Sequence, residues 1–111
     1  MDRIKEVTFI NTKVREEYES LKDGKFEDQE LYKYITRAMT DIKTNPLRHV
    51  RVPKDLIPQI YVQNYGVESL WKYDLPNGWR LLYTITGDEI KIVSVILEWL
   101  DHKSYENRFN Y

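Results

Sequence analysis

Two groups of side chains in the C-terminal third of the chain have the right types to carry chemistry. The first is Arg80, which lies inside an otherwise apolar segment, residues 79–86, that is typical of a β-strand. A planar guanidinium suits bidentate contact with phosphate, and burying its charge without a partner is costly. The simpler explanation is a surface ion pair with Asp74, Glu89 or Glu98.

The second group follows the last predicted strand and comprises Asp101, His102, Lys103 and Tyr105. Histidine is the side chain most readily tuned as a general acid or base near neutral pH. A neighbouring lysine can stabilise developing negative charge, and a tyrosine can stack on a base or take part in proton transfer. The structural alternative is that Asp101 caps a helix whose first turn is exposed and polar.

Further basic residues precede the predicted strands: Arg48, His49, Arg51 and Lys54. They could extend a track of phosphate contacts, or they could serve only to solvate a loop. The two histidines are far apart, no carboxylate stands at ligand spacing, and cysteine is absent. The sequence therefore predicts no metal site.

Composition limits the classes of protein to consider. The chain has 111 residues, 41% of them hydrophobic, which predicts one domain spanning residues 1–111. With 17 basic and 18 acidic side chains the net charge is −1, so any site for an anion must be a local cluster. No apolar run is long enough to span a membrane, and the first nine residues lack the apolar segment of a signal peptide. We therefore expect a cytoplasmic protein.

Apolar spacing predicts helices in the first half of the chain. A strand over residues 4–10 is followed by a helix that Asn11 or Thr12 can cap and that ends near Leu21. A second helix is predicted from an N-cap at Asp28 to the Asn45-Pro46 pair. Its apolar stripe consists of Leu31, Ile35, Ala38, Met39 and Ile42. Together these helices predict a helical hairpin.

The second half predicts one short helix and three antiparallel strands. The helix is expected over residues 56–65, with Pro58 in its first turn and Gly66 just after its end. The strands are expected over residues 69–75, 79–86 and 89–98, followed by helical turns over 101–107. The order predicts a two-layer α+β domain, in which one layer of helices packs on an antiparallel or mixed sheet.

Two strand patterns predict how the sheet is used. Alternation places Arg80, Leu82 and Thr84 on one face, and Leu81 and Tyr83 on the face that packs against the helices. We expect the Arg80 face to be partly open. The segment 92–97 shows little alternation, which indicates a strand that is covered on both faces or lies centrally in the sheet.

In element order and in two motifs, the chain resembles the RelE/ParE superfamily of toxins, including its YoeB-like and HigB-like branches. The motifs are Gly78-Trp79-Arg80-Leu81-Leu82-Tyr83 and the terminal His102-Lys103-Ser104-Tyr105. The resemblance implies a RelE-like fold and a toxin of a type II toxin–antitoxin system. The resemblance implies a metal-independent mRNA endoribonuclease that acts either at the ribosome or on free mRNA. Such a toxin inhibits translation, needs no cofactor and is neutralised by a cognate antitoxin.

The resemblance also implies roles for individual residues. Arg80 would contact the scissile phosphate, His102 or Lys103 would assist proton transfer, and Tyr105 would stack on a base or shuttle a proton. Additional contacts to RNA are expected from Arg48, Arg51, Lys54 and Lys72.

The chain departs from the family pattern on the strand before the arginine. Trp71 and Tyr73 stand where a family member can carry two lysines, and alternation turns Lys72 to the opposite face from both. The alternative function is therefore a RelE/ParE-fold protein without catalysis, which binds an antitoxin, RNA or DNA gyrase.

Overall fold

The computed structural model describes residues 2–110, which form an α+β fold. Its elements are β1 (Ile4–Phe9), α1 (Thr12–Leu21), α2 (Phe26–Thr44), β2 (Val50–Arg51), α3 (Gln59–Tyr65), β3 (Trp71–Asp74), β4 (Arg80–Gly87), β5 (Lys91–Leu100) and α4 (His102–Phe109). Short 3-10 turns occupy residues 54–56 and 76–78. Within residues 2–110, no helix has the length and apolar character needed to cross a membrane.

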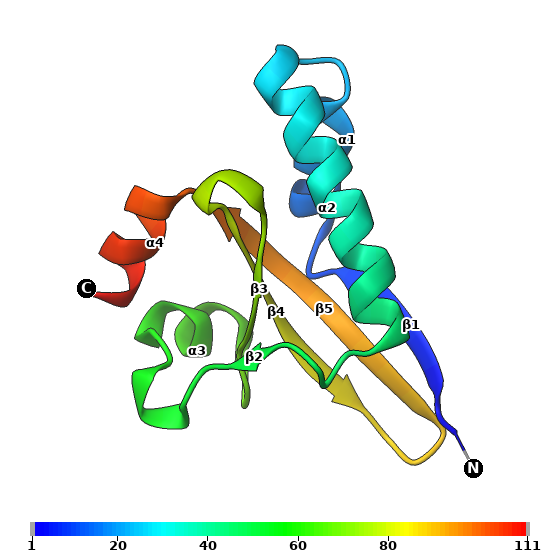
Figure 1. The fold of residues 1–111 in the computed structure, drawn as a ribbon. Coiled ribbons are helices and arrows are strands. Elements are labelled where there is room, and N and C mark those ends of the chain that lie inside the picture. Colours follow the sequence, from blue (N-terminus) through cyan, green and yellow to red (C-terminus); the bar gives the residue numbers. More distant parts are fainter. Residues whose placement is uncertain (1, 111) are drawn as a thin grey trace.

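The five strands form one mixed sheet in the order β1-β5-β4-β3-β2 (Figure 1). β1 pairs with β5 in parallel, and the remaining neighbours are antiparallel. β5 thus has a partner strand on each side, as the apolar run within it predicted. The short β2, at the far edge of the sheet, was not expected from the sequence.

The two helices of the N-terminal hairpin begin with different caps. In α1, the Asn11 side chain accepts a hydrogen bond from the Val14 backbone N–H at 2.9 Å, as expected. The prediction that Asp28 caps α2 was wrong, because the helix already begins at Phe26. Asp28 is its third residue and accepts a hydrogen bond from the Lys25 backbone N–H at 3.1 Å. It therefore satisfies a donor at the helix start from inside the first turn.

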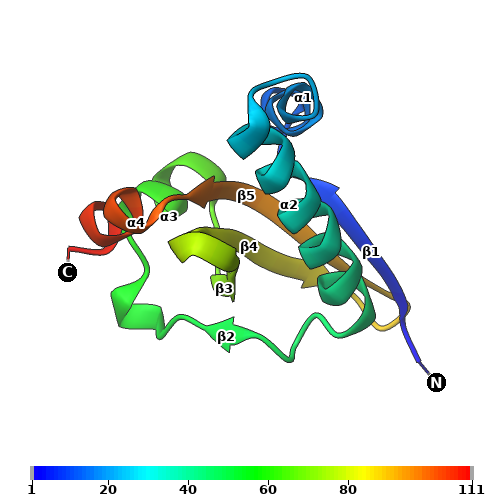
Figure 2. The same cartoon turned by 45° about the horizontal axis from the view of Figure 1, so that its top comes forward.

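The hairpin covers one face of the sheet (Figures 1 and 2). The predicted stripe of α2 is buried at Leu31, Ile35, Ala38 and Ile42. It shares a cluster with side chains of the sheet: Trp71, Leu75, Leu81, Tyr83 and Ile96. The face that alternation assigned to the helices is the one they cover, and burial of this apolar surface is the main source of stability here.

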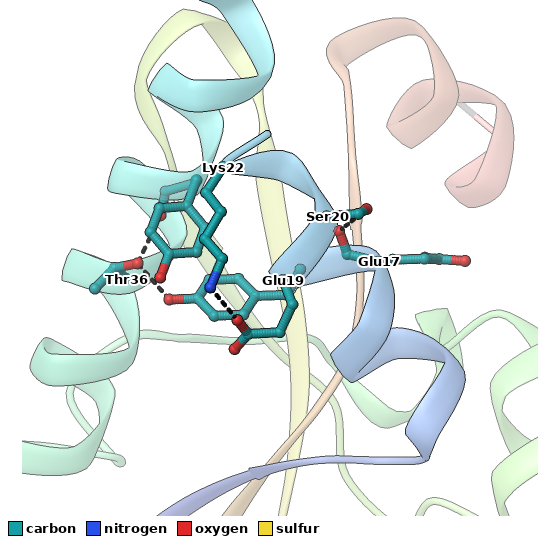
Figure 3. A network of polar contacts seen from close by, with 7 residues as sticks. Glu17, Glu19, Ser20, Lys22 and Thr36 are labelled. Carbon is teal, nitrogen blue, oxygen red and sulfur yellow. Dashed lines mark hydrogen bonds and ion pairs between the residues drawn. The ribbon is translucent and has the colours of Figure 1, made fainter. Parts of the chain in front are cut away.

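Contacts of Tyr18 tie α1 to α2 (Figure 3). The hydroxyl groups of Tyr18 and Thr36 are hydrogen-bonded, and the Tyr18 ring stacks on Tyr32 at 4.6 Å between centroids. Lys22 pairs with Glu19 at 2.8 Å on the exposed surface (Figure 3). Tyr18, through its ring and its hydroxyl, therefore links the two helices, whereas the exposed ion pair lies within the end of α1 and adds little.

A second hydrophobic cluster lies on the opposite face, where α3 and α4 pack. It combines Tyr61 of α3 and Tyr105 of α4 with Leu70, Leu82, Leu97 and Leu100 of the sheet region. The helices therefore cover both faces, which differs from the single helical layer expected. The reason is visible in β4, where Leu81 and Leu82 are both fully buried although they point to opposite faces.

A β-bulge in β5 helps this strand serve both clusters. Opposite Leu82 and Tyr83 of β4, the partners are Glu98 and Ile96, so Leu97 is an extra residue on β5. Ile96 packs in the hairpin cluster, and Leu97 packs in the cluster with α3 and α4. The bulge interrupts the alternation of β5, so the side chains of Leu97 and Glu98 both lie on the face of the sheet that carries Arg80.

Candidate functional site

Arg80 is the first residue of β4 and faces the α4 side of the sheet. Its Nε atom lies 2.9 Å from Oδ1 of Asp74, the residue opposite it on β3. The Nε–H is not aligned with that oxygen, so the contact is an ion pair rather than a hydrogen bond. One guanidinium nitrogen donates to the Trp79 carbonyl at 3.2 Å. Of the three carboxylates considered from the sequence, Asp74 is the one paired with Arg80.

Lys72 lies on the same face as Arg80 and reaches the same carboxylate. Its Nζ atom is 3.4 Å from Oδ1 of Asp74. The two cationic side chains are only 19% and 20% exposed, whereas Asp74 is 57% exposed. Alternation on β3 does turn Lys72 away from Trp71 and Tyr73, and the face it occupies is that of Arg80. The site therefore holds two cations although the expected lysine positions are aromatic.

Tyr105 supports this pair from α4. The centroid of its ring lies 5.3 Å from the Arg80 guanidinium carbon and 5.5 Å from Lys72 Nζ. The ring also packs on Phe109 at 4.5 Å between centroids, and the residue is only 6% exposed. A ring buried to this degree offers little open surface to a nucleobase. Its position instead favours two cation–π contacts that hold Lys72 and Arg80 in place.

His102 and Lys103 lie at the start of α4. Asp101 caps this helix by accepting from the Ser104 N–H at 2.8 Å, and this hydrogen bond lowers the pKa of Asp101. His102 is 65% exposed, and its Nε2 lies 2.7 Å from Oε1 of Glu106, one turn further on. Lys103 is exposed. The structural role expected for Asp101 is therefore confirmed.

His102 lies beside the turn that leads into β4. A Cβ built on Gly78, two residues before Arg80, would lie 3.1 Å from the His102 Cβ. Gly78 has a φ of +81°, which favours glycine on conformational grounds as well. The fold thus brings the histidine of the second motif to the glycine of the first. The two motifs found in the sequence meet at this end of the sheet.

The expected RNA-contacting residues divide between two places. Arg48 and Lys72 both border a cavity of about 510 Å³, which Asp74 and His49 also line. Arg51 and Lys54 border a different hollow of about 670 Å³. The Arg51 guanidinium lies 5.9 Å from the centroid of a Trp71 ring. Of the loop residues, Arg48 and His49 therefore share a cavity with Lys72 and Asp74, whereas Arg51 and Lys54 do not.

Sequence reasoning missed a polar contact in the wall of this cavity. The Tyr73 hydroxyl donates to Asp41 Oδ2, and burial together with this carboxylate raises the pKa of Tyr73 to about 12. The His49 ring packs against Tyr73 at 4.7 Å, and burial lowers the pKa of His49, partly countered by Asp41. These residues come from α2, the following loop and β3, so no local pattern in the sequence links them.

A second missed network fixes α3 and α4 on the sheet. The Tyr61 hydroxyl donates to Glu98 Oε2, and burial raises the pKa of Tyr61. Arg108 lies 3.7 Å from the same oxygen, and its guanidinium is 5.6 Å from the Tyr61 ring centroid. The network joins α3, β5 and α4, and so it positions the helix that carries Tyr105. The sequence placed Tyr61 on one face of a predicted helix, but it gave no indication that Glu98 would accept from its hydroxyl.

The arrangement of Lys72, Arg80 and Asp74 is suited to holding one negative charge. Two positive side chains and one carboxylate leave a formal net charge of +1, and both cations lie within ion-pair distance of one carboxylate oxygen. A phosphate oxygen in that position would meet the same two cations. Among residues 2–110, no three histidine, aspartate or glutamate side chains gather as metal ligands do.

Comparisons with models of known protein families, with characterised proteins and with solved structures found no match for this chain.

Proposed function

We propose that the protein is the toxin of a type II toxin–antitoxin pair, with a RelE-like fold that binds and cleaves mRNA at the ribosome and thereby inhibits translation. The observation that carries the proposal is that Lys72 and Arg80 both lie within ion-pair distance of one oxygen, Oδ1 of Asp74. This pair of cations lies beside α4, the helix that begins at His102. Two cations directed at one position suit a phosphate of the RNA backbone. In this proposal a cognate antitoxin is the protein partner.

The binding step uses the cation pair. Arg80 presents a rigid fork of donors, and Lys72 adds a point charge, so together they orient a phosphodiester and stabilise the charge that develops on it. The Tyr105 ring holds both cations in place through cation–π contacts. Arg48 borders the neighbouring cavity and extends the positively charged surface along the path of the RNA backbone. Arg51 and Lys54 are further contacts for a longer RNA.

The cleavage step needs no metal. The 2′-hydroxyl attacks the adjacent phosphorus, the bond to the 5′-oxygen of the next nucleotide breaks, and the products are a cyclic 2′,3′-phosphate and a 5′-hydroxyl. His102 accepts the proton of the 2′-hydroxyl, and Lys103 supplies the proton taken up by the leaving oxygen. The proximity of His102 to Gly78, two residues before Arg80, supports this assignment of roles.

The second candidate function is binding without cleavage, to RNA, an antitoxin or DNA gyrase. Two observations favour it. The His102 imidazole already contacts Glu106 at 2.7 Å, and Tyr105 is buried against Phe109 rather than presented to a substrate. In this case the cation pair would still hold an anionic partner, while no group would be required to transfer protons.

Two substitutions separate these functions. Arg80→Ala and His102→Ala are compared with wild type and with Arg15→Ala, a change of an exposed arginine on α1. The measurements are growth arrest on expression, cleavage of RNA on translating ribosomes, and binding of a single-stranded RNA. The proposal expects arrest and cleavage by wild type and by Arg15→Ala, and neither by the two site variants.

The outcomes against the proposal are distinct. RNA binding that is lost in Arg80→Ala and kept in His102→Ala, without cleavage by wild type, would support the second candidate function. Absence of both RNA binding and growth arrest in wild type would exclude an RNA-directed toxin. Recovery of a small helical protein encoded beside this one, on affinity purification, would support the antitoxin as partner.

A further inference from the structure

Among Lys72, Arg80 and Asp74, Asp74 is the most exposed and the only acidic side chain. Its side chain is 57% exposed, against 19% for Lys72 and 20% for Arg80. It stands at the last position of β3, directly opposite Arg80. The Tyr105 ring lies against both cations, and Asp74 borders the cavity of about 510 Å³, as Lys72 also does. The carboxylate is thus the side chain of the three that is most accessible to solvent.

The contacts that Asp74 makes are individually weak. An ion pair with an exposed partner such as Asp74 contributes little, because water screens it and the side chain loses freedom. A ligand phosphate that offers three or four oxygens to the same cations can therefore replace the carboxylate. The released side chain would turn towards solvent, at the cavity that Arg48 also borders.

We propose that Asp74 is a resident counter-ion that determines the specificity of the anion site. Its carboxylate oxygen lies where an oxygen of a bound phosphate would lie, within ion-pair distance of both cations. With Asp74 present, the net charge of the three side chains is +1, which matches the single negative charge of a phosphodiester. The inference rests on the proposed function and adds a selection rule to it. The site favours an internal phosphate of an RNA chain over a terminal phosphate monoester, whose second charge Asp74 repels.

The charge balance gives a direct expectation for Asp74→Asn. The variant keeps the shape of the side chain and raises the net charge of Lys72, Arg80 and residue 74 from +1 to +2. Affinity for RNA should then increase by roughly three- to tenfold, the change expected when one or two weak competing contacts are removed. The salt dependence of binding should become steeper by about 0.7 in the slope of log K against log salt, as for one additional neutralised charge on a single strand.

Binding is measured with a short single-stranded RNA whose 2′-hydroxyls are methylated, because this probe cannot be cleaved through the 2′-oxygen. One form carries a 5′-hydroxyl and the other a 5′-phosphate. The proteins are wild type, Asp74→Asn, and Asp23→Asn as a control that makes the same charge change in the turn between α1 and α2. Wild type and the control should bind both RNAs equally, whereas Asp74→Asn should favour the 5′-phosphate form.

Equal affinity of Asp74→Asn and Asp23→Asn for both RNAs would overturn the inference. So would weaker binding by Asp74→Asn, because Asp74 would then hold the cations in a productive position. Asp74→Ser, a smaller neutral side chain, tests the same expectation if the asparagine variant is poorly folded. Loss of RNA binding in Arg80→Ala reports on the proposed function separately, so a failure of the selection rule leaves that function standing.

Discussion

Lys72 and Arg80 occupy adjacent antiparallel strands and place their charges over the same ring, 5.5 Å and 5.3 Å from the centroid of Tyr105. Like charges repel, so two cations on one face need compensation from a nearby negative group. The ring face supplies part of it through its quadrupole, and Asp74 supplies the rest. An aromatic residue of the last helix is therefore a structural part of an anion site that belongs to two strands.

The ring role of Tyr105 can be separated from a hydroxyl role. Tyr105→Phe keeps the cation–π contacts and should leave RNA cleavage within about twofold of wild type. If the hydroxyl transferred a proton, the rate would fall by roughly 10²–10⁴-fold. Tyr105→Leu should weaken RNA binding several-fold, because each lost cation–π contact is worth about 0.5–1 kcal/mol at partly exposed sites. Single-turnover cleavage and fluorescence anisotropy measure the two effects.

Gly78 is expected to be sensitive to substitution for two reasons that can be distinguished. Gly78→Ala combines an unfavourable φ of +81° with a contact of 3.1 Å to the His102 Cβ. Gly66→Ala, at φ +62° with no atom within 4 Å, carries the conformational cost alone, about 1–2 kcal/mol. Urea denaturation should show a larger loss for Gly78→Ala. Equal losses would mean that α4 moves freely away from the turn.

The buried hydroxyl of Tyr61 is expected to stabilise the attachment of α3. Tyr61→Phe removes the hydroxyl that donates to the Glu98 carboxylate. The ion pair between Glu98 and Arg108, at 3.7 Å, is then left. The free energy of unfolding should decrease by about 1–3 kcal/mol. Tyr65→Phe, which removes a hydroxyl from an exposed tyrosine of the same helix, is the matched control and should change it by less than about 0.5 kcal/mol. Similar values for both variants would show that the Tyr61–Glu98 bond contributes nothing.

His49 predicts a pH dependence of stability. Its pKa in the folded protein is lowered below the ordinary value of 6.5, chiefly by burial. The unfolded chain therefore binds a proton more readily than the folded one. The resulting stability is fully present above about pH 6.5 and is lost as the pH falls from there through the folded pKa.

The measurement compares urea unfolding of wild type and His49→Gln between pH 7.5 and 5. Wild type should lose stability more steeply than the variant over this range, because glutamine does not titrate. An NMR titration of the His49 ring protons should give a pKa below 6.5 directly. Parallel stability curves for the two proteins would show that His49 does not contribute to the pH dependence.

The periodic parts of the fold were predictable from sequence because one physical pattern dominates each of them. The stripe of α2 from Leu31 to Ile42 faces a single apolar surface, and the apolar run in β5 reflects neighbours on both sides and both faces. The start of α2 was misplaced because Asp28 satisfies a backbone donor from inside the helix as well as it would from the cap. Local composition does not distinguish these two positions.

The site was predictable in its cations but not in its partners. Arg80 was visible as a charge in an apolar strand, but its face was expected to be partly open, and α3 and α4 instead cover it at Leu82. The distances to Asp74 and Tyr105 depend on strand register and on where α4 packs, which are properties of the assembled sheet. The bonds of Tyr73 to Asp41 and of Tyr61 to Glu98 each span more than 30 residues of chain, so no local spacing encodes them.

The parallel pairing of β1 with β5 has a kinetic consequence. β1 is the first of the five strands in the sequence and its partner β5 is the last, so the register from Ile4–Lys91 to Phe9–Ile96 closes a loop that contains the helical hairpin and the other three strands. Contacts of such long range slow folding. During synthesis the helical hairpin emerges before β3, β4 and β5, which carry most of the side chains that cover its apolar stripe. Nascent chains should therefore expose this stripe to chaperones until β5 has left the ribosome, and the cation pair should form on the β3–β4 hairpin before β1 docks.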